Sequence, residues 1–78
     1  MTIEKIKNNL EINQNKVLQF KINGSRNQVQ EFRGKIIGLY RAVFLIKPED
    51  NDIIQSFAYT DVLIGNVEIK GYKELHIQ

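Results

Sequence analysis

The sequence predicts a mainly β protein, in which a short N-terminal helix precedes five strands of a small, strongly bent barrel. Isoleucine and valine together supply 17 of the 78 residues and alanine only two, a composition that favours strands. Apolar residues recur at helical spacing only near the N-terminus and alternate with polar residues further along the chain. The chain has no cysteine, so its small core has no disulfide to support it.

The helix is expected at about residues 3–11. Its apolar residues Ile3, Ile6 and Leu10 follow helical spacing and form one narrow stripe. The hydroxyl of Thr2 can accept a hydrogen bond from a free N–H of the first turn. So short a helix is stable only when a sheet covers this stripe.

The first strand is expected at about residues 16–23, where the period changes from helical to two. Its apolar positions are Leu18, Phe20 and Ile22. The dipeptide Asn23-Gly24 follows and predicts a tight hairpin, because both residues tolerate a positive φ.

The second strand is expected at about residues 28–39, with Phe32 and Ile36 facing inward. Gly34 and Gly38 interrupt this strand, and glycines inside a strand are typical of a bend or a bulge. Such a bend lets one strand take part in both sides of a small barrel.

Three shorter strands are expected at about residues 42–47, 53–59 and 66–70. The residues at 60–63 break the alternation and predict one helical turn, and the tail at 71–78 is either frayed or an added strand. An OB-fold would usually place a helix between its third and fourth strands, where this chain has only a turn at 48–52. We therefore expect residues 1–78 to form one domain, a five-stranded SH3-like or Sm-like barrel.

The sequence argues against a membrane protein, a metalloprotein and an enzyme. The longest purely apolar run, residues 42–46, is too short to cross a bilayer, and the N-terminus lacks the pattern of a signal peptide, so we expect a cytoplasmic protein. The acidic turn from Glu49 to Asp52 lacks the ligand spacing of a calcium loop. The single histidine, His76, lies in the tail, where a catalytic base would be poorly held. We expect no catalytic residues, no metal and no cofactor.

Charge is unevenly distributed along the chain. Residues 16–41 hold six basic residues and one acidic residue, a net charge of +5, whereas residues 47–78 hold three basic and six acidic residues, a net charge of −3. A candidate binding face, made of the outer side of the first two strands and the turns beside them, comprises Lys21, Arg26, Arg33, Lys35 and Arg41. This face can contact the phosphates of a nucleic acid or a partner protein, or it can simply keep an exposed sheet soluble.

A family resemblance extends over most of the chain. The segments that carry it are 2–10, 16–24, 34–37, 42–46, 56–63 and 67–69, and the most specific block reads Phe57-Ala58-Tyr59-Thr60-Asp61-Val62-Leu63. In these segments the chain resembles the Veg family of small bacterial proteins. The resemblance implies a non-enzymatic regulator associated with the stimulation of biofilm formation, through the control of matrix genes in Gram-positive bacteria, and it implies no catalytic residues.

The chain departs from that family in the hairpin. Family members tend to have a strongly basic Gly-Gly-Arg-Arg-Lys-like stretch after the hairpin asparagine, where this chain reads Gly24-Ser25-Arg26-Asn27-Gln28. Any binding through that stretch would be weaker or altered here.

The sequence and the resemblance together predict a regulatory protein that acts by binding a partner protein. The alternative is a small barrel that binds nucleic acid through its basic face. We expect no membrane association. A homodimer is also expected, because so short a chain has little core to stabilise it and an incompletely closed barrel has free edges.

Overall fold

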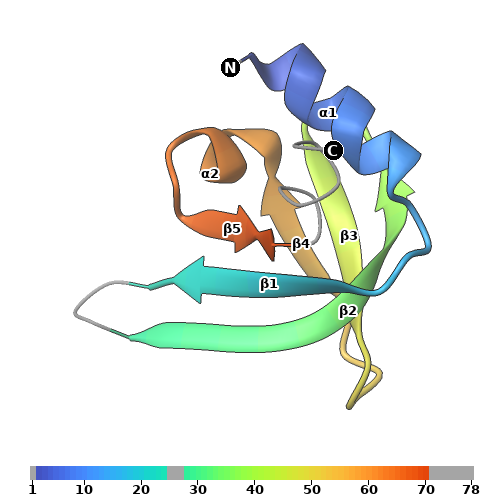
Figure 1. The fold of residues 1–78 in the computed structure, drawn as a ribbon, viewed down its shortest axis with the longest axis vertical. Coiled ribbons are helices and arrows are strands. Elements are labelled where there is room, and N and C mark those ends of the chain that lie inside the picture. The colour runs from blue at the N-terminus through green and yellow to red at the C-terminus, as the bar shows by residue number, and fades with distance from the viewer. Residues whose placement is uncertain (1, 25–27, 71–78) are drawn as a thin grey trace.

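The computed structural model describes residues 2–24 and 28–70 and confirms the mainly β architecture. Its helices and strands, in chain order, are α1 (Ile3–Ile12), β1 (Leu18–Asn23), β2 (Val29–Leu39), β3 (Val43–Pro48), β4 (Gln55–Ala58), α2 (Tyr59–Leu63) and β5 (Val67–Ile69) (Figure 1). The observed bounds differ from the expected ones by at most two residues. The tail at 71–78, with His76, lies outside the described residues. None of the helices in the described part of the chain is long and apolar enough to cross a membrane.

All five strands form one antiparallel sheet in the order β4-β3-β2-β1-β5. The central strand is β2, whose first half pairs with β1 and whose second half pairs with β3. In the described residues β4 and β5 lie at the two edges and do not pair with each other. The sheet is therefore open and does not close into the predicted barrel, because β4 passes directly into α2 and β5 is only three residues long.

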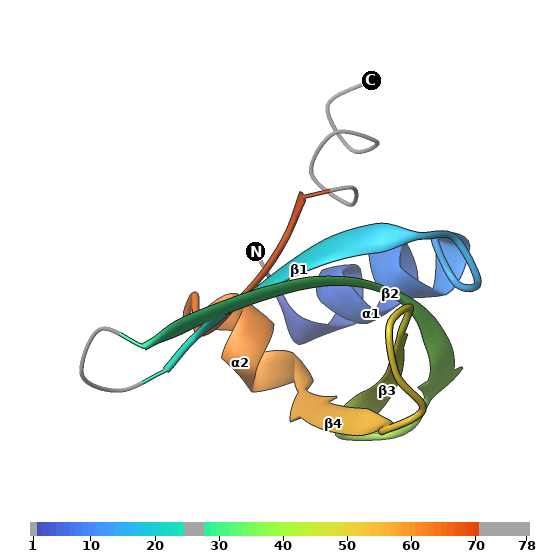
Figure 2. The same cartoon turned by 90° about the horizontal axis from the view of Figure 1, so that it is seen from below.

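The sheet bends along β2, so that β1 and β3 run in very different directions (Figures 1 and 2). Gly34 lies at the bend, opposite Leu18 on one side and Pro48 on the other. A Cβ atom on Gly34 would lie 2.7 Å from the carbonyl oxygen of Lys47. The register then shifts between Ile36 and Gly38, which is a β-bulge. The glycines therefore mark a bend and a bulge, as predicted.

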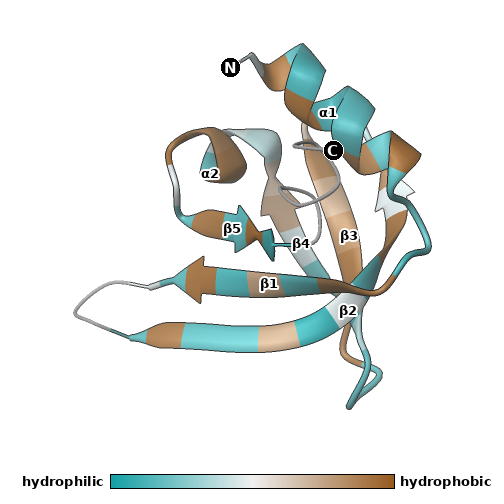
Figure 3. Ribbon diagram, viewed as in Figure 1, coloured by the Kyte–Doolittle hydropathy of each residue, from teal (hydrophilic) through white to brown (hydrophobic). Residues whose placement is uncertain are grey.

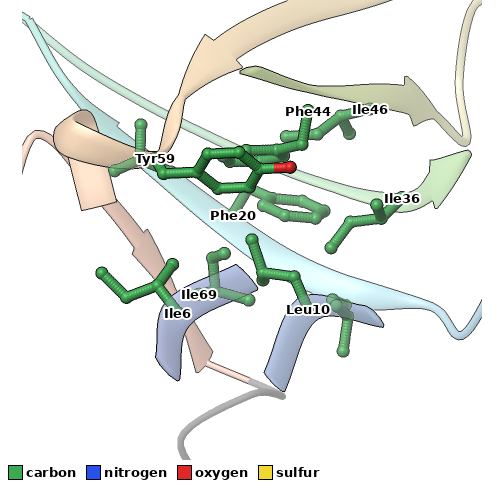
Figure 4. Close-up of a cluster of buried hydrophobic side chains, with 10 residues drawn as sticks. Ile6, Leu10, Phe20, Ile36, Phe44, Ile46, Tyr59 and Ile69 are labelled. Carbon is green, nitrogen blue, oxygen red and sulfur yellow. The ribbon is translucent and has the colours of Figure 1, made fainter. Parts of the chain in front are cut away.

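The core lies between the inner face of the sheet and the two helices. Ile6 and Leu10 of α1 are fully buried, and Figure 4 shows both pointing toward the side chains of the sheet. The predicted cap is present, since Thr2 Oγ1 accepts from the Lys5 N–H at 3.2 Å. Figure 3 shows β3 as an almost continuous hydrophobic strand, whereas β1 alternates. The buried hydrophobic core residues contributed by the sheet are Leu18, Phe20, Ile36, Phe44, Ile46, Val67 and Ile69.

Tyr59 connects the second helix to the rest of the core. Its ring stacks on Phe44, with 5.6 Å between the ring centroids, and only 1% of the residue is exposed. Its hydroxyl donates to the carbonyl oxygen of Tyr40 at 2.7 Å, which joins α2 to the turn between β2 and β3. Burial raises the pKa of Tyr59 above its ordinary value of 10.0, and the negative charge of Glu11 adds to the rise.

Asp61 caps the first turn of α2. Its Oδ2 accepts from the backbone N–H of Ala58 at 3.2 Å, so this carboxylate has a structural role in the block on which the family resemblance mainly rests.

We predict that Gly34→Ala destabilises the protein by about 1–3 kcal/mol, because the new methyl group would collide with the backbone of β3. Gly38→Ala is the matched control. There the three atoms nearest to the new Cβ all belong to the side chain of Tyr40, the closest at 3.0 Å, and this exposed side chain can move away. Urea unfolding measures both variants. If Gly34→Ala and Gly38→Ala lowered the free energy of unfolding equally, a collision specific to the backbone beside Gly34 would be contradicted.

We predict that Tyr59→Phe lowers the free energy of unfolding near neutral pH by about 0.5–1.5 kcal/mol, because the hydrogen bond to Tyr40 is lost. The folded wild type retains the Tyr59 proton at a pH where the unfolded chain has released it. The stability gained from this group is therefore complete below pH 10 and decreases as the pH rises through the raised pKa. Urea unfolding at several pH values should show the difference between wild type and variant narrowing above pH 10. A constant difference would contradict the raised pKa.

Candidate interaction surface

The outer face of the sheet, opposite the helices, presents side chains of both charges. The register of β1 with its two neighbours places Lys21 directly opposite Glu31 of β2 and Glu68 of β5. Glu68 Oε2 also accepts from Asn23 Nδ2 at 2.9 Å, and Lys70 Nζ lies 3.8 Å from Glu31 Oε1. The half-buried Lys21 is thus surrounded by acidic groups, one of which comes from the acidic C-terminal half of the chain.

Arg33 and Lys35 are exposed on the outer face of β2. Arg33 is opposite Gln19 of β1, and its carbonyl oxygen accepts from the N–H of Glu49 at 2.9 Å. Lys35 is opposite Lys47 of β3, so two cations face each other there. The exposed carboxylate of Asp52 lies 3.7 Å from Lys47 Nζ.

The five residues of the predicted basic face are thus only partly brought together. Lys21, Arg33 and Lys35 share the outer face, as expected. Arg41 is exposed in the turn after β2, beyond the end of that strand. Arg26 lies outside the described residues. Acidic residues from distant parts of the sequence lie among the basic ones, which the count of charges along the chain did not reveal.

Exposed apolar side chains lie beside Lys35. Extending the register of β1 and β2 by one residue places Val17 opposite Lys35, and Ile37 is the extra residue of the bulge. The ring of Tyr40 covers Gly38, which pairs with Leu45 of β3. The exposed fractions are 48% for Val17, 37% for Ile37 and 54% for Tyr40.

We call this region the outer patch, and it comprises Val17, Lys35, Ile37, Tyr40 and Lys47. It combines three exposed apolar residues with two lysines that face each other. The sequence analysis missed the apolar part, although alternation from the inward-facing Ile36 already places Ile37 outward. The bulge then puts Gly38 on the outer face as well, where the ring of Tyr40 lies over it. The sequence signal that could have indicated this arrangement is Gly38, which lies inside a predicted strand and two residues before Tyr40.

A hollow of about 310 Å³ lies on the β1–β2 hairpin. Its lining residues are Ile22, Gly24, Gln28, Val29 and Gln30. None of these has a titratable side chain, so the hollow offers apolar and amide contacts and no acid or base. Within the ranges 2–24 and 28–70, no group of three or more histidine, aspartate or glutamate side chains is placed to hold a metal ion.

Comparison with known proteins identifies the family. No curated protein matches the chain. The family model described as biofilm formation stimulator VEG matches residues 1–70, in agreement with the resemblance of the individual segments. Since this match covers nearly the whole chain, the protein belongs to the VEG family of biofilm formation stimulators.

Proposed function

We propose that the protein is a non-enzymatic regulator that stimulates biofilm formation by binding a partner protein through the outer patch. The family assignment supports the biological role. The observation that supports the mode of action is the exposure of Val17, Ile37 and Tyr40 beside two lysines. Exposed apolar groups that lie together and are bordered by polar residues are typical of protein interaction sites.

The chemistry of the outer patch favours a protein over a nucleic acid. Aromatic residues are enriched at protein interfaces, and Tyr40 offers an exposed ring within the outer patch. A nucleic-acid site would need a continuous basic surface, whereas Glu31, Glu68 and Asp52 lie among the cations of the outer face.

The scaffold that we propose is an SH3-like or Sm-like barrel that remains partly open. Two features support it, the return of β5 to pair with β1 after the helical turn α2, and the sharp bend of β2. We also propose a cytoplasmic location, where the control of matrix genes implied by the family resemblance would take place.

The proposal predicts that Val17→Asp combined with Lys35→Glu abolishes the stimulation of biofilm formation. The two changes place negative charges in the middle of the outer patch. The measurement is biofilm mass in a bacterial strain that lacks its own copy and expresses the variant, which should fall to the level given by an empty vector. Circular dichroism and thermal unfolding should show that the variant remains folded, because both side chains are exposed.

Ile12→Asp combined with Lys5→Glu is the matched control. Both of these residues are exposed on α1, which covers the opposite face of the sheet, and Ile12 is 69% exposed. The control should stimulate biofilm formation as the wild type does. If the two double variants behave alike, the outer patch is not the binding surface.

Fluorescence anisotropy with labelled single-stranded RNA and duplex DNA distinguishes the two kinds of partner. We expect no binding to either probe at tens of micromolar protein. Tight binding that weakens steeply with salt, and that is lost in an Arg33→Gln, Lys35→Gln and Lys47→Gln variant, would instead establish a nucleic-acid-binding regulator.

A further inference from the structure

The edge strand β4 has one side free of any other strand in the described part of the chain. Tyr59 donates its N–H to Ala42, the residue that precedes β3, at 3.3 Å. Because successive residues of a strand direct their N–H and C=O groups to opposite sides, Phe57 and Gln55 also face β3, and Ile54, Ser56 and Ala58 face outward. The N–H of Ala58 agrees with this, since it donates to Asp61 and not to β3, and this donor is therefore not available to a further strand.

The residues along this free edge lack the features that prevent strands from pairing with other chains. Natural edge strands are protected by charged residues, proline, bulges or a covering element. The segment Ile53-Ile54-Gln55-Ser56-Phe57-Ala58 has no charge and no proline, and Ile53 and Ile54 are 70% and 50% exposed. In Figure 2 β4 lies along the lower boundary of the molecule, with no helix or strand below it.

The other edge of the sheet is charged. Glu68 lies within β5, and Lys70 follows it. The two edge strands are similar in length, three residues in β5 and four in β4, so charge is what distinguishes them. β4 is therefore the edge that is open to a further strand.

We propose that two copies of the chain join through antiparallel pairing of their β4 strands, about a two-fold axis at or next to Ser56. Two uncharged segments then face each other. A strongly charged strand of another protein would find no opposite charge along β4. With the axis at Ser56, Ile54 is opposite Ala58 of the second copy, so no charged residues face each other within the paired strands.

A two-fold arrangement is favoured over other arrangements of the same edge. Pairing of β4 with β5 of a second copy would be head-to-tail and would lead to a ring or an open chain. That contact would place the charged, three-residue β5 against the uncharged edge. The pairing of β4 with itself also joins the two five-stranded sheets into one, with an outer patch on each half.

Analytical ultracentrifugation at tens to hundreds of micromolar protein tests the proposal. The wild type should sediment with twice the 9.1 kDa mass of one chain. Ile54→Lys should be monomeric, because two ammonium groups would be brought into the paired edge. Ile12→Lys, the same substitution at an exposed site on α1, should remain dimeric.

A monomeric wild type overturns the proposal, and so does a dimer that Ile54→Lys leaves intact. A mass above that of a dimer would indicate a head-to-tail contact and would also overturn it. If the β4 edge instead binds an extended peptide of another protein, the purified wild type will be monomeric.

Cysteine substitution provides a second test, because the chain has no cysteine of its own. Paired residues on antiparallel strands have Cα atoms about 4.5–5.5 Å apart, within the range that a disulfide spans. Under oxidation we expect a covalent dimer from Ser56→Cys alone, or from a mixture of Ser56→Cys and Ile54→Cys if the axis lies at Gln55. Asn51→Cys, exposed in the turn before β4, should not cross-link. Absence of a covalent dimer in both cases would overturn the pairing.

Discussion

The structure depends on the close approach of β2 and β3 at Gly34. This residue has a strand on each side, with Leu18 of β1 opposite it in one direction and Pro48 of β3 in the other. With 2.7 Å between the position of a Cβ atom and the carbonyl oxygen of Lys47, a glycine is required there. Because β2 can bend at this point, one strand serves two hairpins, and the inner face curves around the stripe of apolar residues that α1 presents.

The same pairing decides how charge is distributed on the outer face. Antiparallel register brings Glu68 and Glu49, from the acidic second half of the chain, beside Lys21 and Arg33. A net charge of +5 over residues 16–41 therefore does not become a uniformly basic surface. What remains is a local pair of lysines, Lys35 and Lys47, next to exposed apolar side chains, and our proposal of a protein partner is based on this combination.

Much of the fold could be predicted from local patterns, because the decisive signals lie within a few residues of one another. The stripe that begins at Ile3 and the change of period at Lys16 locate α1 and β1. Closure of the sheet could not be predicted, since it depends on whether β4 and β5 meet, and that contact is set by the length of β5 and by the direct passage from β4 into α2. The place of Tyr40 in the outer patch could not be predicted for a similar reason, because the bulge between Ile36 and Gly38 puts Gly38 on the outer face, where the Tyr40 ring covers it.

The small size of the protein leaves few places for a function to reside. The inner face of the sheet and the apolar sides of both helices are used to build the core, and Tyr59 occupies the space between them. The described residues that remain form the outer face, the two edges, the hairpin and the exposed sides of the helices. Of the two edges, β5 is charged whereas β4 is uncharged and exposes Ile53 and Ile54. The outer face combines lysines with exposed apolar side chains, whereas the β4 edge is uncharged, and this difference is why we propose a regulatory protein as the partner of the first and a second copy of the chain as the partner of the second.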